Sequence, residues 1–166
     1  MLDGGCGTGL CAPTLKAWAS GLVGVDLSGA MLEKARQKQL YYRLVESELT
    51  HFLEQHGGVF DLAVYADTLC YFGDLQDVLR ASAHALSSPG TLLFTLEALH
   101  FEDGARGFQL HPHGRYSHTP AYVRKTLQDC GFSQISIHTD SMRQEVGKPV
   151  EGLVVSARRL LIAQTS

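Results

Sequence analysis

The chain has 166 residues, 45% of them hydrophobic, and a formal net charge of -3. This length and composition predict one globular domain, residues 1–166, with a core of ordinary size. The slightly acidic balance and the lack of a Lys/Arg-rich run argue against nucleic acid as a partner, and no apolar run has the length of a membrane span. We therefore expect a cytoplasmic protein, and the sequence does not indicate its oligomeric state.

A glycine-rich turn stands near the start of the chain. Asp3 is followed by Gly5, Gly7 and Gly9 in the spacing D-x-G-x-G-x-G. Glycines permit a tight turn and a close approach of the backbone to a ligand, and the N–H groups at a helix start point at that ligand. Leu10 stands where a dinucleotide-binding motif needs its third glycine, and no Lys-Ser or Lys-Thr pair follows as in a P-loop. The pattern favours a nucleotide-like ligand without a pyrophosphate; the alternative is a turn of purely structural meaning.

The run Leu-Asp-Gly-Gly-Cys-Gly-Thr-Gly resembles the first motif of class I S-adenosylmethionine-dependent methyltransferases, with Gly4 where a larger aliphatic residue is more usual. The resemblance implies that this segment positions the methionine and ribose portions of S-adenosyl-L-methionine, through Asp3, Gly5, Cys6, Gly7 and Gly9. It also implies a fuller first strand and one or two N-terminal helices, so we expect an N-terminally shortened form; the alternative is a wrongly assigned start. Cys6 is expected to fit the turn as a small residue; a reactive thiol is the alternative.

A helical pattern and a buried strand follow the turn. Apolar residues have helical spacing at Cys11, Leu15, Trp18 and Ala19, and Leu22–Val25 predicts a short parallel strand that ends at Asp26. An acid at the tip of the second strand can accept hydrogen bonds from both ribose hydroxyls, so we expect Asp26, with Leu27 beside it, to bind the cofactor. The alternative is an ordinary turn aspartate. Ser28 is the expected N-cap of a helix that directs Met31, Leu32 and Ala35 inward.

The next two strands add three candidate residues. After Leu44-Val45, the resemblance assigns the adenine contacts to Glu48 and Leu49, while Glu46 or a merely solvated glutamate are alternatives. Phe60–Tyr65 predicts the fourth strand, and Asp67 at its end should border the methyl donor because ligands of open sheets bind outside the carboxyl ends of strands. Tyr71 is a second candidate there, and the alternative is that it and Phe72 simply pack over the sheet.

The following segments predict a helix, a strand and a long loop. The helix carries Leu75–Leu86 behind an Asp74 cap and ends at Ser88-Pro89-Gly90, and Thr91–Glu97 is expected to be a fully buried strand. Ala98–Thr119 has poor periodicity and predicts a loop that selects the acceptor. Within it we expect an acid-base or orienting role for His111, His118 or Tyr116. A metal site formed by His111, His113 and His118 is one alternative, although we expect no metal. The other alternative is that these are polar loop residues without a chemical role.

The C-terminal part predicts a helix and two strands. Thr119-Pro120 is a helix start and Gly131 its end, and Phe132–His138 and Leu153–Ala157 read as strands joined by a loop at Asp140–Pro149. This ending resembles the antiparallel hairpin that closes class I methyltransferase sheets. The predicted fold class is therefore α/β, a Rossmann-like open sheet of about seven mostly parallel strands with a C-terminal antiparallel strand and helices on both faces.

A narrower resemblance is carried by three segments. These are Y-F-G-D-L, G-R-Y-S-H-T-P-A-Y-V and R-Q-E-V-G-K-P-V-E-G-L-V-V, which are similar to predicted methyltransferases that elsewhere occur fused to tetratricopeptide repeats. The expected function is transfer of a methyl group from S-adenosyl-L-methionine to an unidentified small-molecule acceptor. The alternatives are a protein that binds this cofactor without transfer, a methyltransferase that acts on a protein and, disfavoured by its glycine spacing, a dehydrogenase.

Overall fold

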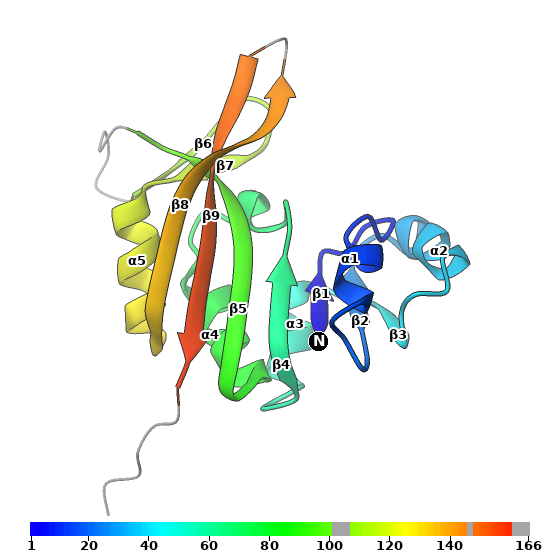
Figure 1. Cartoon of the computed structure of the whole chain (residues 1–166). Helices are drawn as coiled ribbons and strands as arrows, with labels where there is room; N and C mark the ends of the chain where they lie inside the picture. The colour runs from blue at the N-terminus through cyan, green and yellow to red at the C-terminus, as the bar shows by residue number, and fades with distance from the viewer. Residues whose placement is uncertain (101–106, 146–147, 161–166) are drawn as a thin grey trace, which may run out of the picture.

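The computed structural model describes residues 1–100, 107–145 and 148–160, which form an α/β fold around one mixed sheet (Figure 1). Within these residues the sheet has nine strands in the order β3-β2-β1-β4-β5-β7-β6, with β9 pairing both β5 and β8. The strands are β1 (Leu2–Gly4), β2 (Val23–Asp26), β3 (Arg43–Glu46), β4 (Phe60–Tyr65), β5 (Leu86–Ala98), β6 (Phe108–Leu110), β7 (Tyr116–His118), β8 (Phe132–Glu145) and β9 (Lys148–Arg159). The helices are α1 (Ala12–Lys16), α2 (Gly29–Gln37), α3 (Leu49–Glu54), the 3-10 turn η1 (Leu69–Tyr71), α4 (Gln76–Ala85) and α5 (Pro120–Asp129).

The order of the strands reverses beside β1. The chain first builds outward from β1 to β2 and β3, all parallel, and then returns to pair β4 with the other edge of β1. Because crossovers between parallel strands are right-handed, α1 and α2 lie on one face of the sheet, and α3 and α4 lie on the other. The predicted α/β class is confirmed, and the place where the order reverses is where such sheets bind ligands.

The strand β5 joins the parallel part of the sheet to the antiparallel part. One edge pairs in parallel with β4 and, past the end of β4, with β7 at Glu97 and Ala98. The other edge pairs antiparallel with β9. Its side chains alternate between buried and half-exposed from Thr91 to Thr95, so the prediction of a strand buried on both faces is wrong. Leu92, Phe94 and Leu96 face the core, and the intervening residues face the other side.

Several helix signals in the sequence are confirmed. Ser28 caps α2, since its hydroxyl accepts a hydrogen bond from the Met31 N–H, and Thr119 caps α5 in the same way. The N-cap of α4 is Leu75 and not the predicted Asp74, although Asp74 accepts a hydrogen bond from the Gln76 N–H beside it. In each case a side-chain oxygen takes one of the N–H groups that a helix start leaves without a partner.

Other expectations for the helices are wrong. The helix α1 is a single short segment, and Trp18, expected to face inward, is 83% exposed beyond its end. Met31 is also 47% exposed, while Leu32 and Ala35 are buried as expected. The helix α3 was not anticipated. Among the described residues, no helix has the length and apolar content needed to cross a bilayer.

The predicted loop at 98–119 contains regular structure. Phe108–Leu110 and Tyr116–His118 form an antiparallel hairpin, β6–β7, which accounts for the strands beyond the expected seven. Residues 101–106 of that loop lie outside the described residues. The C-terminal strands are also longer than expected, because pairing between β8 and β9 extends to Glu145 and Lys148. Of the predicted loop at 140–149, residues 146–147 lie outside the described residues.

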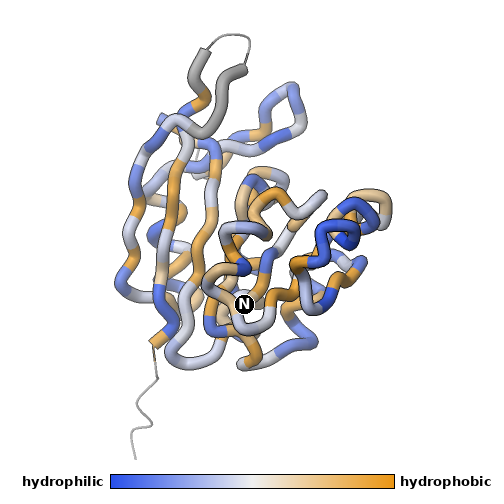
Figure 2. Tube along the Cα trace, turned by 45° about the vertical axis from the view of Figure 1, so that its right-hand side comes forward, coloured by the Kyte–Doolittle hydropathy of each residue, from blue (hydrophilic) through white to orange (hydrophobic). Residues whose placement is uncertain are grey.

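The hydrophobic core is concentrated on the central strands, where apolar residues follow one another in Figure 2. Tyr65 is fully buried there, and its hydroxyl forms a 2.9 Å hydrogen bond with the Ser82 hydroxyl. Its ring also explains Gly4, since a Cβ at that position would lie 2.5 Å from Tyr65 Cδ1 and 2.9 Å from Leu49 Cδ1. The larger aliphatic residue usual in this motif would have no room here.

His118 belongs to this interior. Its ring is fully buried, stacks on Tyr122 at 5.9 Å, and donates through Nε2 to the Gly73 carbonyl at 2.9 Å. Among the described residues, His118 Nδ1 is a buried polar atom without a hydrogen-bond partner. Burial lowers the pKa of His118 below its ordinary value of 6.5, and the hydrogen bonds to the backbone oppose this only in part. Because the ring is neutral and enclosed in the core, it cannot contact a bound acceptor substrate directly.

We expect His118 to contribute to acid sensitivity. Since its pKa is lower in the folded than in the unfolded chain, the unfolded chain binds the additional proton as the pH falls below 6.5, and the free energy of unfolding decreases. The variant His118→Gln should lose less stability between pH 7 and pH 5 than the wild type. Urea unfolding at several pH values measures this, with the exposed His138→Gln as control. Equal slopes for wild type and His118→Gln would contradict the assignment.

Candidate functional site

Acidic residues lie at or directly after the carboxyl ends of five neighbouring strands. The strands β1, β2, β3, β4 and β5 bring to this edge Asp3, Asp26, Glu46, Asp67 and Glu97, respectively. Because parallel strands place their carboxyl ends at one edge, residues far apart in the sequence meet there. This edge is therefore the candidate functional site.

The glycine turn between β1 and α1 is held against β2. The N–H groups of Gly5 and Cys6 both donate to the Val25 carbonyl, at 2.7 and 3.0 Å. Gly5, Gly7 and Gly9 all have positive φ, at 70°, 53° and 75°. At Gly5 a Cβ would also clash with the Thr68 side chain. Glycine is the residue that adopts this conformation at low cost, so the backbone here is exposed to a ligand without side chains in the way.

Asp26 connects the glycine turn to the start of α2. Its Oδ2 accepts a hydrogen bond from the Gly7 N–H and its Oδ1 accepts one from the Ser28 N–H, both at 2.8 Å. Each carboxylate oxygen has a second lone pair, and the residue is partly exposed. The carboxylate is thereby fixed in orientation and can still accept two further hydrogen bonds, as a ribose diol would offer.

Asp3 lies deeper than Asp26. It is 2% exposed, and its Oδ2 accepts a 2.6 Å hydrogen bond from the Tyr41 hydroxyl. Burial raises the pKa of Asp3, the hydrogen bond from Tyr41 lowers it, and the neighbouring charge of Asp26 raises it. Two carboxylates beside one turn make the site unfavourable for a pyrophosphate and favourable for a cationic group.

Cys6 is a buried thiol in the turn. Burial, followed by the charges of Asp3 and Asp26, raises the pKa of Cys6 to about 12. A thiol with this pKa is protonated at neutral pH and is a poor nucleophile. The geometry therefore favours Cys6 as a small side chain that fits the turn over the alternative of a reactive cysteine.

The residues expected near adenine have different surroundings. Glu48 is the N-cap of α3, and its two carboxylate oxygens accept from the Thr50 and His51 N–H groups at 2.9 and 2.8 Å. Leu49 is 6% exposed and packs in the core. Leu27, directly after Asp26, is 71% exposed and so has apolar surface free for a ligand. The structure thus gives Glu48 and Leu49 structural roles that the sequence did not indicate.

Asp67 anchors the β6–β7 hairpin to the end of β4. It has a φ of 58°, and both of its carboxylate oxygens accept from the Arg115 guanidinium, at 2.6 and 3.1 Å. Arg115 also donates to the Tyr71 hydroxyl at 3.2 Å, lies over the Tyr71 ring and approaches Glu97 Oε1 at 3.6 Å. Arg115 therefore holds together four segments of the site edge: the hairpin, the end of β4, η1 and the end of β5.

We expect the Arg115–Asp67 pair to be stronger than an ordinary surface ion pair. A double-mutant cycle with Arg115→Met and Asp67→Asn should give a coupling energy of about 1–2 kcal/mol, because the pair is bidentate and the Arg115 side chain is only 20% exposed. The exposed helix pair Lys125–Asp129 is the control, with about 0.3–0.5 kcal/mol expected. Equal coupling in both cycles would show that Arg115 is not a structural anchor.

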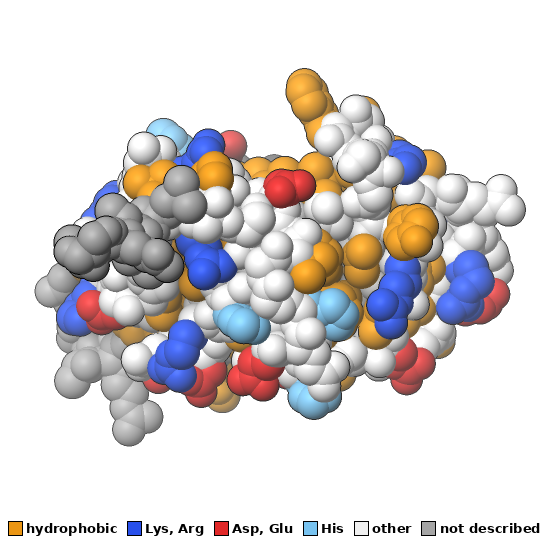
Figure 3. Space-filling model, turned by 90° about the horizontal axis from the view of Figure 1, so that it is seen from below, with side chains coloured by type: hydrophobic (Ala, Val, Ile, Leu, Met, Phe, Trp, Pro, Cys, Tyr) orange, Lys and Arg blue, Asp and Glu red, His pale blue; other side chains and the backbone are white. Residues whose placement is uncertain are grey.

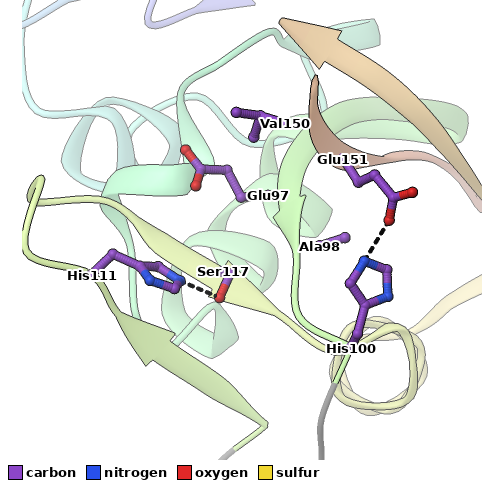
Figure 4. Close-up of a pocket in the computed structure, with 7 residues that line it drawn as sticks. All are labelled: Glu97, Ala98, His100, His111, Ser117, Val150 and Glu151. Carbon is purple, nitrogen blue, oxygen red and sulfur yellow. Dashed lines mark hydrogen bonds and ion pairs between the residues drawn. The ribbon is translucent and has the colours of Figure 1, made fainter. Parts of the chain in front are cut away.

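A pocket of about 330 Å³ lies beside this anchor, between the end of β5, the β6–β7 hairpin and β9 (Figure 4). In it, His111 Nε2 and the Ser117 hydroxyl form a 2.7 Å hydrogen bond, and His100 pairs with Glu151. The Glu97 side chain comes from β5, and the His111 ring comes from the segment that joins β6 to β7 (Figure 4). The pocket is lined by Glu97, Ala98, His100, His111, Ser117, Val150 and Glu151.

The three predicted catalytic residues are not equivalent. His111 lines the pocket, whereas the Tyr116 ring packs against Gly73, where a Cβ would lie 2.8 Å from Tyr116 Cε1. His118 is enclosed in the core, as described above. The structure therefore keeps His111 as the candidate for acid-base chemistry, and it gives Tyr116 and His118 packing roles.

The opposite end of the molecule has a different character. Figure 3 shows the face below the sheet in the orientation of Figure 1, where basic and acidic side chains are interspersed. Phosphate-binding surfaces need clustered positive charge, which this face does not present.

Comparison with known proteins decides between the remaining families. Residues 2–94 match the family described as "Methyltransferase domain". This chain belongs to that family. The match covers the glycine turn, Asp26 and the strands up to β5, which are the parts of the methyltransferase domain that form the candidate cofactor site.

Similar proteins differ in what they act on. The methyltransferase domain is 32% identical over 98 residues to sarcosine/dimethylglycine N-methyltransferase of Halorhodospira halochloris, covering 55% of this chain and 34% of that protein. It is 34% identical over 98 residues to malonyl-[acyl-carrier protein] O-methyltransferase of Salmonella typhimurium, covering 57% and 38%. The chain thus spans less than half the length of these relatives.

The fold is shared over nearly the whole chain. The solved structure of a SAM-dependent methyltransferase from Methanosarcina mazei aligns with a TM-score of 0.76 and 18% identity, covering 96% of this chain and 92% of that one. At this identity the likeness shows the fold, and it confirms the Rossmann-like methyltransferase architecture. It includes β6–β9, which lie beyond the residues that match the family.

The site contains two residues that the sequence did not reveal. Tyr41 stands before β3 and Arg115 stands in the predicted loop, yet their partners, Asp3 and Asp67, are 38 and 48 residues away. Neither residue belongs to a motif or a periodic pattern. The sequence indicated for Arg115 only that a positively charged side chain lies in the segment expected to border the acceptor substrate.

Proposed function

We propose that this methyltransferase domain transfers a methyl group from S-adenosyl-L-methionine to a small-molecule acceptor. The observation that carries the proposal is the Asp26 carboxylate, which is fixed by the Gly7 and Ser28 N–H groups beside a turn of positive-φ glycines. Such a carboxylate suits a ribose diol, and the adjacent turn leaves room for a ligand. When bound, the cofactor supplies a methyl group that its sulfonium has already activated.

The residues of the site divide the binding between them. Asp3 and the glycine turn would hold the methionine portion, Asp26 the ribose, and the exposed Leu27 side chain would cover apolar ligand surface. Glu48 and Leu49 stay as proposed adenine contacts, although their helix-capping and core positions argue for supporting roles. Asp67 would act mainly by fixing the hairpin through Arg115.

The acceptor is proposed to enter the pocket at the end of β5. It lies at the carboxyl edge of the sheet, next to the Arg115 anchor, and its volume of about 330 Å³ is at the small end of the range for small-molecule sites. His111 is the residue placed to accept a proton from a hydroxyl or ammonium acceptor there, with its ring oriented by Ser117. The names of the relatives include an N- and an O-methyltransferase, which favours nitrogen or oxygen as the acceptor atom.

The protein's remaining task is geometric. In-line transfer requires the donor carbon and the acceptor atom to be held at roughly 3–3.5 Å with water excluded. Elements on both sides of the candidate acceptor pocket are fixed, since Arg115 joins the hairpin to η1 and β9 pairs along β5. We expect these contacts to orient the acceptor more than to activate it.

Other expectations from the sequence stay proposals. These are a single domain over residues 1–166, a cytoplasmic location, an acceptor other than nucleic acid, and a relation to methyltransferases fused to tetratricopeptide repeats.

A radiolabelled transfer assay tests the proposed function. The purified chain is incubated with methyl-labelled S-adenosyl-L-methionine and a panel of small amines, hydroxyl compounds, carboxylates and test proteins. Label transferred to a small molecule, and lost in Asp26→Ala, is the expected result. Cofactor binding without labelling of any acceptor would favour a binding protein, and labelling of a protein alone would favour the protein-directed alternative.

A further inference from the structure

The phenol ring of Tyr41 occupies a slot beneath the glycine turn. A Cβ at Gly24 on β2 would lie 2.8 Å from Tyr41 Cε1, and a Cβ at Gly9 in the turn would lie 3.0 Å from Tyr41 Cε2. Two glycines on different segments thus leave the room that this ring fills. Contacts at these distances would displace the ring if either glycine carried a side chain.

Hydrogen bonds to backbone carbonyls keep this segment in place. Tyr41 follows α2 and precedes β3, and the N–H of the adjacent Tyr42 donates to the Leu22 carbonyl at 2.8 Å. Lys38, at the end of α2, donates to the Gly9 carbonyl at 2.9 Å. The position of the Tyr41 hydroxyl is therefore set by β2, by α2 and by the turn itself.

The hydroxyl is directed at the most buried acid of the site. It donates to Asp3 Oδ2 at 2.6 Å, a short distance typical of a hydrogen bond to a carboxylate. The strand β1 fixes the Asp3 backbone, because Asp3 pairs with Gly24 on one side and Val64 on the other. Among the described residues, Asp3 Oδ1 has no hydrogen-bond partner, so one oxygen of an oriented carboxylate is left for a ligand.

We propose that Tyr41 is a positioning residue of the cofactor site: its hydroxyl orients Asp3 so that Oδ1 receives the ammonium group of the methionine portion. This inference rests on the proposed function. Burial and the bond to Asp3 raise the pKa of Tyr41, so the phenol stays protonated and can donate its proton to the Asp3 carboxylate. Its hydrogen bond in turn favours the charged form of Asp3 against the effect of burial.

The test compares two ligands and two neighbouring tyrosines. S-adenosylhomocysteine carries the amino acid portion, whereas 5′-methylthioadenosine has the same adenosine without it. Measured by isothermal titration calorimetry, the affinity of Tyr41→Phe for S-adenosylhomocysteine should be about tenfold lower than that of the wild type. Its affinity for 5′-methylthioadenosine should be nearly unchanged. Tyr42→Phe is the matched control, since the Tyr42 side chain is 83% exposed, and it should bind both ligands as the wild type does.

A pH profile separates positioning from packing. Without the Tyr41 hydroxyl the pKa of Asp3 rises further, so affinity for S-adenosylhomocysteine should begin to fall at a higher pH in Tyr41→Phe than in the wild type. The other ionisable groups that act on Asp3 or are influenced by it are Asp26, Cys6 and Cys11. Cys6 also interacts with the Tyr41 hydroxyl, but burial raises the pKa of its thiol to about 12, so Cys6 stays neutral in the acidic range where Asp3 titrates. In an Asp3→Asn background, Tyr41→Phe should cause no additional loss.

The outcomes are distinct. Equal binding of S-adenosylhomocysteine by Tyr41→Phe and the wild type would overturn the inference while the proposed function stands. An equal loss for both ligands, with no change in the pH profile, would show that Tyr41 acts by packing alone and would also overturn it. If the folded wild type binds neither ligand, the proposed function fails and this inference fails with it.

Discussion

Replacing Asp26 with alanine is expected to lower the affinity for S-adenosyl-L-methionine at least about 100-fold, with little change in the overall fold. The bound ligand would lose its two hydrogen bonds to the Asp26 carboxylate, each worth about 1.5–3 kcal/mol because the acceptor is charged. The Gly7 and Ser28 N–H groups would also lose their acceptor, so the turn would be less well ordered before binding. Isothermal titration calorimetry measures the affinity directly.

Two further variants give this experiment its controls. Asp26→Asn retains one carbonyl oxygen as acceptor and should have intermediate affinity. Asp129→Ala removes an exposed carboxylate at the end of α5 and should bind as the wild type does. Unchanged affinity in Asp26→Ala, with circular dichroism showing a folded protein, would remove the basis for a ribose contact at this position.

The second large effect is expected at Gly7. In Gly7→Ala the new Cβ meets only the Met31 sulfur, at 3.7 Å, so the described residues around it would accept the methyl group. The positive φ of 53° costs the alanine variant about 1 kcal/mol of unfolding free energy. The methyl group would, however, occupy space beside the turn that we assign to the ligand, and affinity for the cofactor should fall about tenfold or more.

Gly58 offers a matched control for this substitution. It has a φ of 68° and nothing within 4 Å of an added Cβ, and it lies before β4, at the opposite edge of the sheet. Gly58→Ala should therefore cost a similar unfolding free energy in urea titrations but leave cofactor affinity unchanged. If both variants bind the cofactor equally well, Gly7 does not border the ligand.

Local patterns in the sequence predicted much of the architecture. The glycine spacing, the apolar runs of β2 and β4, and the caps Ser28 and Thr119 each depend on neighbouring residues, and the structure places them as expected. The position of Asp26 at the end of the parallel strand β2 is also as predicted, and its role in binding the cofactor stays a proposal.

Elements were missed where a residue could have two roles or a segment was short. The interpretation of Glu48 as an adenine contact stays a proposal, but the sequence analysis did not predict that Glu48 also caps α3, although Leu49, Phe52 and Leu53 have helical spacing. The hairpin β6–β7 has three-residue strands, too short for an alternating pattern to stand out. Trp18 was placed on the inner face of a helix that ends before it.

The contacts that orient the site could not be predicted in this way. Tyr41 reaches Asp3 and Arg115 reaches Asp67 only after the strands are assembled, since each pair joins distant segments. The same holds for Gly4, whose small size is explained by the Tyr65 ring on a neighbouring strand. Packing between elements, which no local pattern encodes, decides these positions.

The central claim is that Asp26 and the glycine turn bind the adenosyl portion of the cofactor. A crystal structure of the chain with S-adenosylhomocysteine tests this most directly. We predict both ribose hydroxyls within hydrogen-bonding distance of the Asp26 carboxylate, with the glycine turn against the ligand. A ligand bound elsewhere, or a ribose without contact to Asp26, would contradict the account.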